Sequence, residues 1–235
     1  MKLTILIGCF NEKPTILKVI EQAKSINIDK EIIVIDNCST DGTREILEGL
    51  KNDKALRLVF HSKNMGAGYS ACEGIRLAQG EYFYGPGADL EYKMDDVYKM
   101  VDKLEDEHLD VVFGSRLLDR KDVSKRELIK ERPYWLGTII ATFLINLLYR
   151  KNFTDIIATK LIKTGVLKKL GCKANNQAFE FELVSNLCKK GYKIGEVPVW
   201  YKPRTHKEGK TIRALDMVPA VLAILRVKFW LGKNA

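Results

Sequence analysis

The chain has 235 residues, of which 46% are hydrophobic and 29% charged, with 17 glycines and 6 prolines. This composition excludes a disordered, collagen-like or low-complexity chain, and the length permits one α/β domain with a substantial core. Lysine and arginine outnumber aspartate and glutamate by 39 to 30. The net charge of +9 favours phosphate-bearing partners such as nucleotides, nucleic acid or anionic lipid.

Strands and helices alternate along the first half of the chain. Apolar, β-branched runs predict strands over residues 2–10, 31–35, 56–60, 81–84 and 109–113. Apolar spacing predicts helices that begin near residue 14 and that cover residues 43–51, 66–79 and the stretch around 97–104. This alternation predicts a mostly parallel sheet covered by helices on both faces. Polar loops at 8–12, 36–43, 85–92 and 114–116 fall at the carboxyl ends of the strands, where such sheets bind ligands.

The second half is more apolar and more helical. We expect helices over residues 135–149, 179–190 and 217–231, and a strand over residues 194–201. No internal repeat or linker interrupts the chain, so we expect a single domain over residues 1–235. Its halves are residues 1–120 and 121–235.

The helix at 135–149 is the most apolar segment, but a membrane-spanning helix needs about 20 residues. Thr138, Thr142 and Asn146 form a weakly polar stripe on it. It is either a buried core helix or an interfacial helix that lies on a bilayer or on a partner chain. The basic segment 202–213 is a solvated surface, a phosphate clamp or a contact with lipid headgroups.

The five cysteines are odd in number and form no C-x-x-C pair. We therefore expect neither a disulfide scaffold nor a zinc site, and a reducing cytosolic location fits. The apolar run at residues 3–10 ends at Asn11 and Glu12 without a cleavage pattern, so it does not predict a signal peptide.

Asp36 and Asn37 directly follow a predicted strand. A carboxylate at this place can accept hydrogen bonds from a base edge or a ribose hydroxyl. The alternative is that Asp36 caps the turn and Asp41 caps the next helix. The sequence alone leaves both interpretations open.

Asp89 and Glu91 lie two positions apart just after another strand, so extended geometry points both side chains the same way. Their oxygens suit Mg²⁺ or Mn²⁺ holding a diphosphate, although this spacing also occurs by chance on surfaces. Arg116 ends a strand, with Arg132 downstream. Arginines near a phosphate site stabilise a departing anion, but isolated arginines are more often solvated.

Taken in order and spacing, these segments resemble family 2 glycosyltransferases of the GT-A fold. The segments are Asn11-Glu12, VIDNCSTDGT (34–43), NMGAGYSACEGIRLAQGEY (64–82), ADLEY (88–92), VVFGSR (111–116), Thr154-Asp155, FEFE (179–182) and GYKIGEVPVWYKPRTHKEGKTI (191–212). They look most like the dolichyl-phosphate mannose synthase and polyprenyl-phosphate glycosyltransferase group. The resemblance implies a Rossmann-like, mostly parallel sheet with C-terminal amphipathic helices. It also implies inverting transfer of a hexose from a GDP- or UDP-sugar to a polyprenyl or dolichyl phosphate.

The resemblance also implies roles for individual residues. The implied nucleotide-sugar contacts are Cys9, Asn11, Glu12, Asp36, Asn37, Gly66, Gly68 and Ala88. The implied catalytic residues are Asp89, Arg116 and Arg132, the metal ligands for Mg²⁺ or Mn²⁺ are Asp89 and Glu91, and the acceptor-phosphate contacts are Arg204 and Lys210. Two departures stand out. Gly87 replaces the first aspartate of the usual D-x-D motif, and residues 156–160 are one residue short of the usual stretch.

An acceptor phosphate is already an anion near neutral pH, so such an enzyme needs positioning and diphosphate stabilisation rather than a strong base. The expected partners are the nucleotide sugar, the lipid phosphate and the membrane surface, with a homo-oligomer or a membrane protein as a further partner and no nucleic acid. We expect a cytoplasmic protein, peripheral at the membrane face. The alternatives are a weakened, nucleotide-binding scaffold or regulatory subunit, and a transferase that acts on a glycan.

Overall fold

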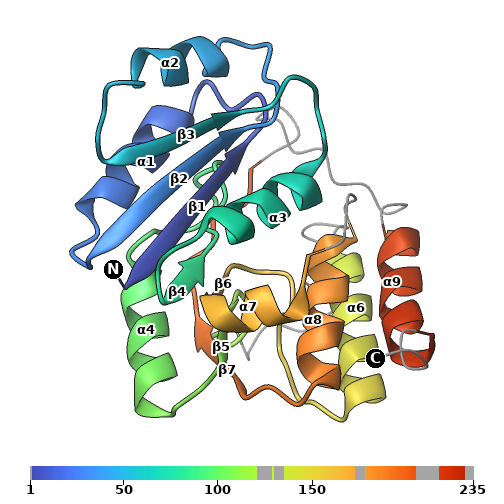
Figure 1. Cartoon of the computed structure of the whole chain (residues 1–235). Coiled ribbons are helices and arrows are strands. Elements are labelled where there is room, and N and C mark those ends of the chain that lie inside the picture. The colour runs from blue at the N-terminus through green and yellow to red at the C-terminus, as the bar shows by residue number, and fades with distance from the viewer. Residues whose placement is uncertain (1, 121–128, 130–134, 173–177, 205–216, 231–235) are drawn as a thin grey trace.

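The computed structural model describes residues 2–120, 129, 135–172, 178–204 and 217–230 (Figure 1). The strands are β1 (Leu3–Cys9), β2 (Lys30–Asp36), β3 (Leu56–Phe60), β4 (Tyr82–Tyr84), β5 (Val111–Ser115), β6 (Lys160–Lys163) and β7 (Ile194–Pro198). The helices are α1 (Ile16–Ser25), α2 (Thr43–Gly49), α3 (Ala67–Leu77), α4 (Asp96–Asp106), α6 (Trp135–Tyr149), α7 (Thr164–Leu170), α8 (Phe179–Lys189) and α9 (Met217–Phe229).

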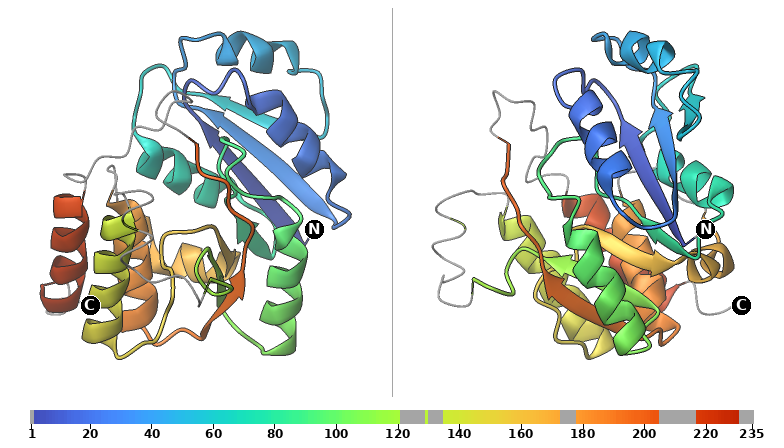
Figure 2. Two further views of the ribbon diagram at one scale, coloured as in Figure 1. Left: turned by 180° about the vertical axis from the view of Figure 1, so that it is seen from behind. Right: turned by 90° about the vertical axis from the view of Figure 1, so that its left-hand side faces the viewer.

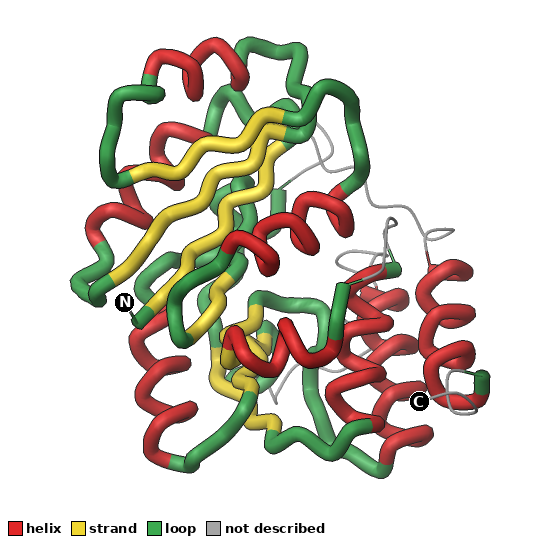
Figure 3. Tube along the Cα trace, in the orientation of Figure 1, coloured by secondary structure: helices red, strands yellow, loops and turns green. Residues whose placement is uncertain are grey.

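The described strands form one mixed sheet in the order β3-β2-β1-β4-β6-β5-β7, drawn yellow in Figure 3. Neighbouring strands are parallel except that β6 runs antiparallel to both β4 and β5. The carboxyl ends of the other strands therefore meet at the edge where β6 begins. The mostly parallel α/β sheet expected from the sequence is confirmed.

Helices cover both faces of the sheet (Figure 2). Side chains of β1 alternate between the faces, as a period of two requires. Ile5 and Ile7 join the core cluster that includes α1 and α4, whereas Leu6 joins the cluster that includes α3, α6, α7, α8 and α9. The sheet is thus buried on both sides, which explains the nearly continuous apolar runs of β1 and β2.

Two elements were missed by the sequence analysis, which placed no regular structure between residues 149 and 179. These are β6 and α7. The strand has only four residues, KLIK, and a lysine at each end hides its apolar character. Its first lysine, Lys160, is nevertheless buried, and its Nζ donates to Glu180 at 2.6 Å. A short strand with a neutralised buried lysine gives no periodic signal.

The polar stripe of α6 faces the protein. Thr138 and Thr142 are buried, and Asn146 exchanges two hydrogen bonds with the backbone of Phe153, at 2.8 and 2.9 Å. The opposite face is apolar and open to solvent, with Phe143 59% and Leu147 63% exposed. The apolar face of this amphipathic helix is therefore exposed to solvent.

The last helix, α9, repeats this arrangement. It packs beside α6 and α8 (Figure 1), with Ala223, Ile224 and Val227 buried. Leu222 is 60% exposed, and Trp230, just beyond the helix, is 81% exposed. Among the described residues, no helix combines the length and apolarity needed to cross a bilayer.

One disulfide joins Cys72 on α3 to Cys172 beyond α7, while Cys9, Cys38 and Cys188 are free thiols. The sequence analysis expected no disulfide scaffold, and it did not predict this single bridge. The two residues are 100 positions apart, so no local spacing motif such as C-x-x-C could indicate the bridge.

Candidate functional site

A cavity of about 340 Å³ opens at the carboxyl edge of the sheet. Its lining comes from the end of β1, from α3, and from the loops that follow β4 and precede β6. Of the residues implied to bind the nucleotide sugar or metal, Cys9, Asn37 and Asp89 line it. The lining also includes Lys160 and Glu180, which the sequence did not single out as site residues.

Cys9 lines this cavity as a neutral thiol. Burial, with added repulsion from Asp36 and Glu12, raises its pKa to about 12. Its Sγ contacts the carbonyl oxygen of Ile35 at 3.5 Å. A thiol held this way contributes size and weak polarity rather than a nucleophile or a metal ligand.

The loop after β1 is fastened to the loop after β2. Asn11 adopts a left-handed conformation, with φ of 57°, which asparagine tolerates better than most residues. Its backbone N donates to Ser39 Oγ at 2.9 Å, and its Oδ1 accepts from Thr40 N at 2.8 Å. Glu12 N donates to Thr43 Oγ1 at 2.9 Å. These bonds leave the Glu12 carboxylate directed toward another partner, Arg204.

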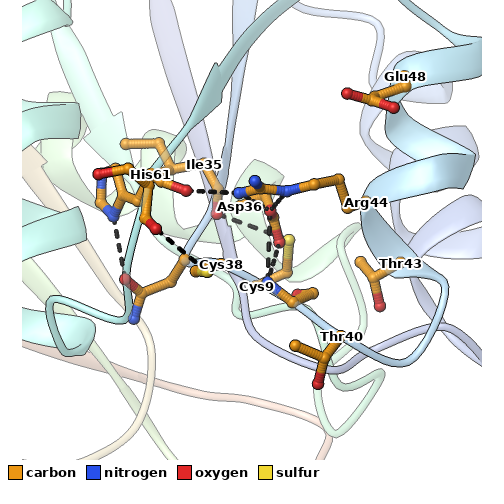
Figure 4. Close-up of polar contacts among 12 residues, drawn as sticks. Cys9, Ile35, Asp36, Cys38, Thr40, Thr43, Arg44, Glu48 and His61 are labelled. Carbon is orange, nitrogen blue, oxygen red and sulfur yellow. Dashed lines mark hydrogen bonds and ion pairs between the residues drawn. The ribbon is translucent and has the colours of Figure 1, made fainter.

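Asp36 is fully buried and lies outside the residues that line the cavity. Its carboxylate accepts from Ser39 N at 3.1 Å and from Arg44 Nε at 2.7 Å. Figure 4 shows Arg44 reaching from Asp36 to the carbonyl oxygen of His61, to which Nη2 donates at 2.6 Å. The structure therefore gives Asp36 a bonding role within the loops, and its contact with a nucleoside stays a prediction.

Asn37 is directed to the cavity and to the glycine-containing segment before α3. Its Oδ1 accepts from Met65 N at 2.8 Å, and its Nδ2 donates to Asn64 Oδ1 at 2.9 Å. Asn64 Oδ1 also accepts from Gly66 N at 2.9 Å. Gly66 has a φ of 86°, a conformation that favours glycine, and it precedes the first turn of α3.

An acidic cluster surrounds Arg204 at the mouth of the cavity. The guanidinium donates to both oxygens of Glu12, at 2.9 and 3.0 Å, and lies 3.5 Å from Asp89 Oδ2. The backbone N of Arg204 donates to Glu91 Oε1 at 2.8 Å. Burial and the nearby Glu91 charge raise the pKa of Asp89, against the opposing effects of a hydrogen bond from Glu91 N and of Arg204. Two carboxylates, Glu12 and Asp89, thus lie beside the guanidinium, and a third, Glu91, lies at the backbone N of Arg204.

The donor set of this cluster fits a divalent metal. Asp89 and Glu91 supply hard carboxylate oxygens, the type that Mg²⁺ and Mn²⁺ prefer. Within the described ranges, no three histidine, cysteine, aspartate or glutamate side chains group tightly enough to hold a metal by themselves. Gly87, with φ of 82°, holds the position of the first aspartate in the D-x-D motif that the resemblance implies. The remaining ligands would have to come from a bound phosphate group.

Arg116 is buried behind this cluster. Its Nε and Nη2 donate to Asp155 Oδ2 and Oδ1 at 2.6 and 3.0 Å, and the guanidinium lies 4.6 Å from the ring centre of Trp135 and 5.0 Å from that of Tyr201. Burial opposes ionisation of Asp155, but the charge and hydrogen bonds of Arg116 prevail and lower its pKa. The pair joins the end of β5 to the segment between α6 and β6, and a catalytic role for Arg116 stays a prediction.

The sequence profile described as "Glycosyl transferase family 2" matches residues 4–171. The chain belongs to this family. A cholesterol galactosyltransferase of Borreliella burgdorferi is 31% identical over 195 residues, which are 76% of this chain and 52% of that protein. A dolichyl-phosphate beta-glucosyltransferase of Saccharomyces cerevisiae is 26% identical over 258 residues, covering 98% of this chain and 75% of that protein.

A solved structure of glucosyl-3-phosphoglycerate synthase from Mycobacterium tuberculosis, in complex with Mn²⁺, uridine diphosphate and glucosyl-3-phosphoglycerate, shares the fold. Its TM-score is 0.62 at 16% identity, covering 97% of this chain and 80% of that chain. The family 2 chain therefore has the GT-A fold, as expected, and is a glycosyltransferase of the hexosyltransferase type.

The structure brings most of the implied residues of this family 2 enzyme together, in two layers. In or beside the cavity lie Cys9, Glu12, Asn37, Ala88, Asp89, Glu91 and Arg204. Asn11, Asp36, Gly66, Gly68 and Arg116 support the surrounding loops and helices. Arg132 and Lys210 lie outside the described residues. Arg44 and His61 were missed, because partners distant in sequence leave no spacing pattern. Asp155 belongs to a segment that carries the resemblance, but its pairing with Arg116 was not predicted.

Proposed function

We propose that this enzyme is an inverting glycosyltransferase that moves a hexose from a GDP- or UDP-sugar to a polyprenyl or dolichyl phosphate. One observation carries the proposal: Arg204, from the basic segment after β7, lies 3.5 Å from Asp89 at the mouth of the cavity. This cation from the basic segment would lie between the leaving diphosphate and the acceptor phosphate. The dolichyl-phosphate relative supports a lipid-phosphate acceptor.

On the donor side, the nucleoside would occupy the part of the cavity lined by Cys9, Asn37 and Ala67. The diphosphate would then point toward Asp89. A divalent ion, Mg²⁺ or Mn²⁺, would be held by Asp89 and Glu91. When bound, it supplies positive charge that stabilises the leaving diphosphate.

On the acceptor side, Arg204 would orient the lipid phosphate, with Lys210 from the same segment as its proposed second contact. An oxygen of the phosphate monoester attacks the anomeric carbon, and the bond from that carbon to the diphosphate breaks. The nucleoside diphosphate leaves with the bonding electron pair, and the anomeric configuration inverts. The acceptor oxygen is already ionised near neutral pH, so no base has to remove a proton.

The outward faces of α6 and α9 would lie in the headgroup region of a membrane. Phe143, Leu147 and Leu222 expose apolar side chains there, and Arg150 and Lys151 follow directly on α6. Apolar faces flanked by basic residues suit a surface of anionic lipid. Residues 1–120 would then bind the donor and residues 121–235 the acceptor, within one domain that is peripheral at the cytoplasmic face.

The test is a direct assay of the purified chain. UDP-glucose, UDP-galactose and GDP-mannose are each offered with a polyprenyl phosphate and Mn²⁺, and the lipid-linked product is quantified and its anomeric configuration determined by NMR. We expect one donor to be used, with inversion. A second candidate follows from Gly87: if the native chain binds nucleotide without turnover and Gly87→Asp restores turnover, the protein is a weakened nucleotide-binding scaffold instead.

A further inference from the structure

A buried lysine at the start of β6 lines the cavity. Lys160 is 7% exposed, and it shares a face of the strand with Ile162, which lines the cavity too. A lysine charge is costly to bury, and an apolar residue at this place would pack against the same core at lower cost. Packing alone therefore does not explain why the cavity wall carries a lysine here.

Three contacts hold the amine of Lys160 in one place. Its Nζ donates to the carbonyl oxygen of Ala158 at 2.9 Å and to Glu180 Oε2 at 2.6 Å. The amine also lies 5.5 Å from the ring centre of Phe113, the residue opposite it on β5. An ammonium group has three N–H donors, so one of them has no acceptor among the described residues. The amine is thus fixed and can still donate one hydrogen bond.

Glu180 brings an acceptor from α8. Its side chain is 48% exposed and lines the cavity. One carboxylate oxygen, Oε2, accepts from Lys160, and no described residue donates to the other, Oε1. Glu180 lies in the first turn of α8, where the helix dipole favours a carboxylate. That position explains the glutamate by itself, but not the lysine buried beside it.

The sheet order places this pair beyond the proposed diphosphate site. The loop after β4, which carries Asp89, lies between the end of β1 and the start of β6. Thr159 Oγ1, just before Lys160, donates to the carbonyl oxygen of Gly85 in that loop at 3.1 Å. A donor with its nucleoside at Cys9 and its diphosphate at Asp89 would therefore extend its sugar toward β6 and α8.

A free N–H beside a free carboxylate oxygen matches two neighbouring hydroxyl groups of a hexose. Each hydroxyl can donate and accept a hydrogen bond, and bonds to charged partners are the stronger ones. We propose that Lys160 and Glu180 are specificity-determining residues that bind two adjacent hydroxyls of the donor hexose. This rests on the proposed function, since it names the part of the donor that the pair reads. A site built in this way rejects a sugar that lacks either hydroxyl.

Comparing a nucleotide with its sugar nucleotide separates this role from a structural one. UDP, UDP-glucose, UDP-galactose, GDP and GDP-mannose are titrated by calorimetry into the full chain with Mn²⁺ and no acceptor. For the donor that binds, we expect K160M to weaken the sugar nucleotide at least about tenfold and to leave the parent nucleotide within about twofold. K163M removes the lysine at the other end of β6, which lies 3.6 Å from Asp110, and as the matched control should change neither affinity.

The double variant K160M/E180A guards against misfolding, because it leaves no charge of the pair without its partner. It should also bind the nucleotide normally and the sugar nucleotide weakly. Analogues of the bound donor with one hydroxyl removed from the hexose then locate the contact. We expect the wild type to bind the analogues altered at two neighbouring positions about tenfold more weakly than the parent donor, and the double variant to bind them all alike.

Two results would overturn the role of the pair. One is a loss of nucleotide affinity in K160M equal to the loss of sugar-nucleotide affinity, which would place Lys160 at the diphosphate. The other is equal binding of every deoxygenated analogue by the wild type, which would mean that no hydroxyl is read. If the wild type binds neither nucleotide nor sugar nucleotide, the proposed function itself fails.

Discussion

The guanidinium of Arg204 and the carboxylate of Glu12, 192 positions apart, form two parallel hydrogen bonds of 2.9 and 3.0 Å. This fork ties the segment after β7 to the loop after β1. The same guanidinium lies 3.5 Å from Asp89. Arg204 therefore fixes the position of the segment after β7, which would bind the acceptor, relative to the loops after β1 and β4, which would bind the donor.

Replacing Arg204 tests this arrangement. Lysine keeps the charge but cannot form the fork. We expect R204K and R204A to lower kcat by an amount on the order of 100-fold, because a positioned cation at the reacting phosphates is lost. The measurement is lipid-linked sugar formation at saturating donor. K18A removes an exposed charge on α1, away from the basic segment, and should retain activity. Wild-type turnover by R204A would contradict the role.

Asp89→Asn separates metal dependence from nucleotide binding. The amide keeps the shape but lowers the charge of the cluster, so we expect turnover to fall on the order of 100-fold and Mn²⁺ to stop enhancing UDP or GDP binding. Calorimetry with and without Mn²⁺ measures this directly. D95N, at an exposed carboxylate before α4, is the control. Undiminished Mn²⁺ enhancement in D89N would place the ion elsewhere.

Asp155→Asn leaves the buried guanidinium of Arg116 without its counter-charge. Removing one partner of a buried ion pair lowers the free energy of unfolding by about 3–5 kcal/mol. Urea denaturation at pH 7 should show a decrease of that size. D119N, an exposed carboxylate in the same region, should change stability little.

The same pair predicts a pH dependence. The folded pKa of Asp155 lies below the unfolded value, which is near 3.9. Its stabilising contribution is therefore complete above that unfolded value and is lost as the pH falls through the lowered folded pKa. Unfolding free energies measured from pH 6 down to pH 3 should decline less steeply for D155N than for the wild type. Parallel profiles would show that Asp155 is not coupled to folding in this way.

The outward face of α6 predicts binding to lipid vesicles. Burying a large apolar side chain contributes about 1.5–3 kcal/mol, so the double variant F143S/L147S should reduce co-sedimentation with anionic vesicles at least about tenfold. Both side chains are more than half exposed, so the melting temperature should hardly change. L17S, at a residue 45% exposed on α1, is the matched control. Equal binding by both variants would exclude this face as the membrane contact.

The sequence predicted those parts of the fold that carry long apolar signals. The strand over residues 56–60 and the helix over residues 135–149 agree residue for residue with β3 and α6. The antiparallel strand β6 was not predicted, because its four residues, with a lysine at each end, resemble a loop. The sequence also left the orientation of α6 open. The threonine stripe faces inward: Thr138 Oγ1 accepts from Arg116 Nη2 at 3.4 Å, whereas Thr142 Oγ1 is buried without a hydrogen-bond partner among the described residues.

The family resemblance predicted part of the site. Asn37 and Asp89 were singled out and do line the cavity. The supporting contacts were not predictable, since Arg44, His61 and Asp155 act through partners that only the folded chain brings close. Long-range pairs of this kind have no period and no fixed spacing, so a single sequence does not indicate them.

The reversed direction of β6 has a practical consequence for handling the enzyme. Every parallel strand leads into the site as it ends, whereas β6 leads away from it, so the turns at the far edge carry none of the proposed binding residues. The turn around His108, between α4 and β5, belongs to that far edge. A fluorescent domain or surface-attachment tag inserted there would leave the ligand loops and the apolar faces of α6 and α9 unobstructed. An enzyme attached through this turn would therefore keep its proposed site accessible to a supported bilayer.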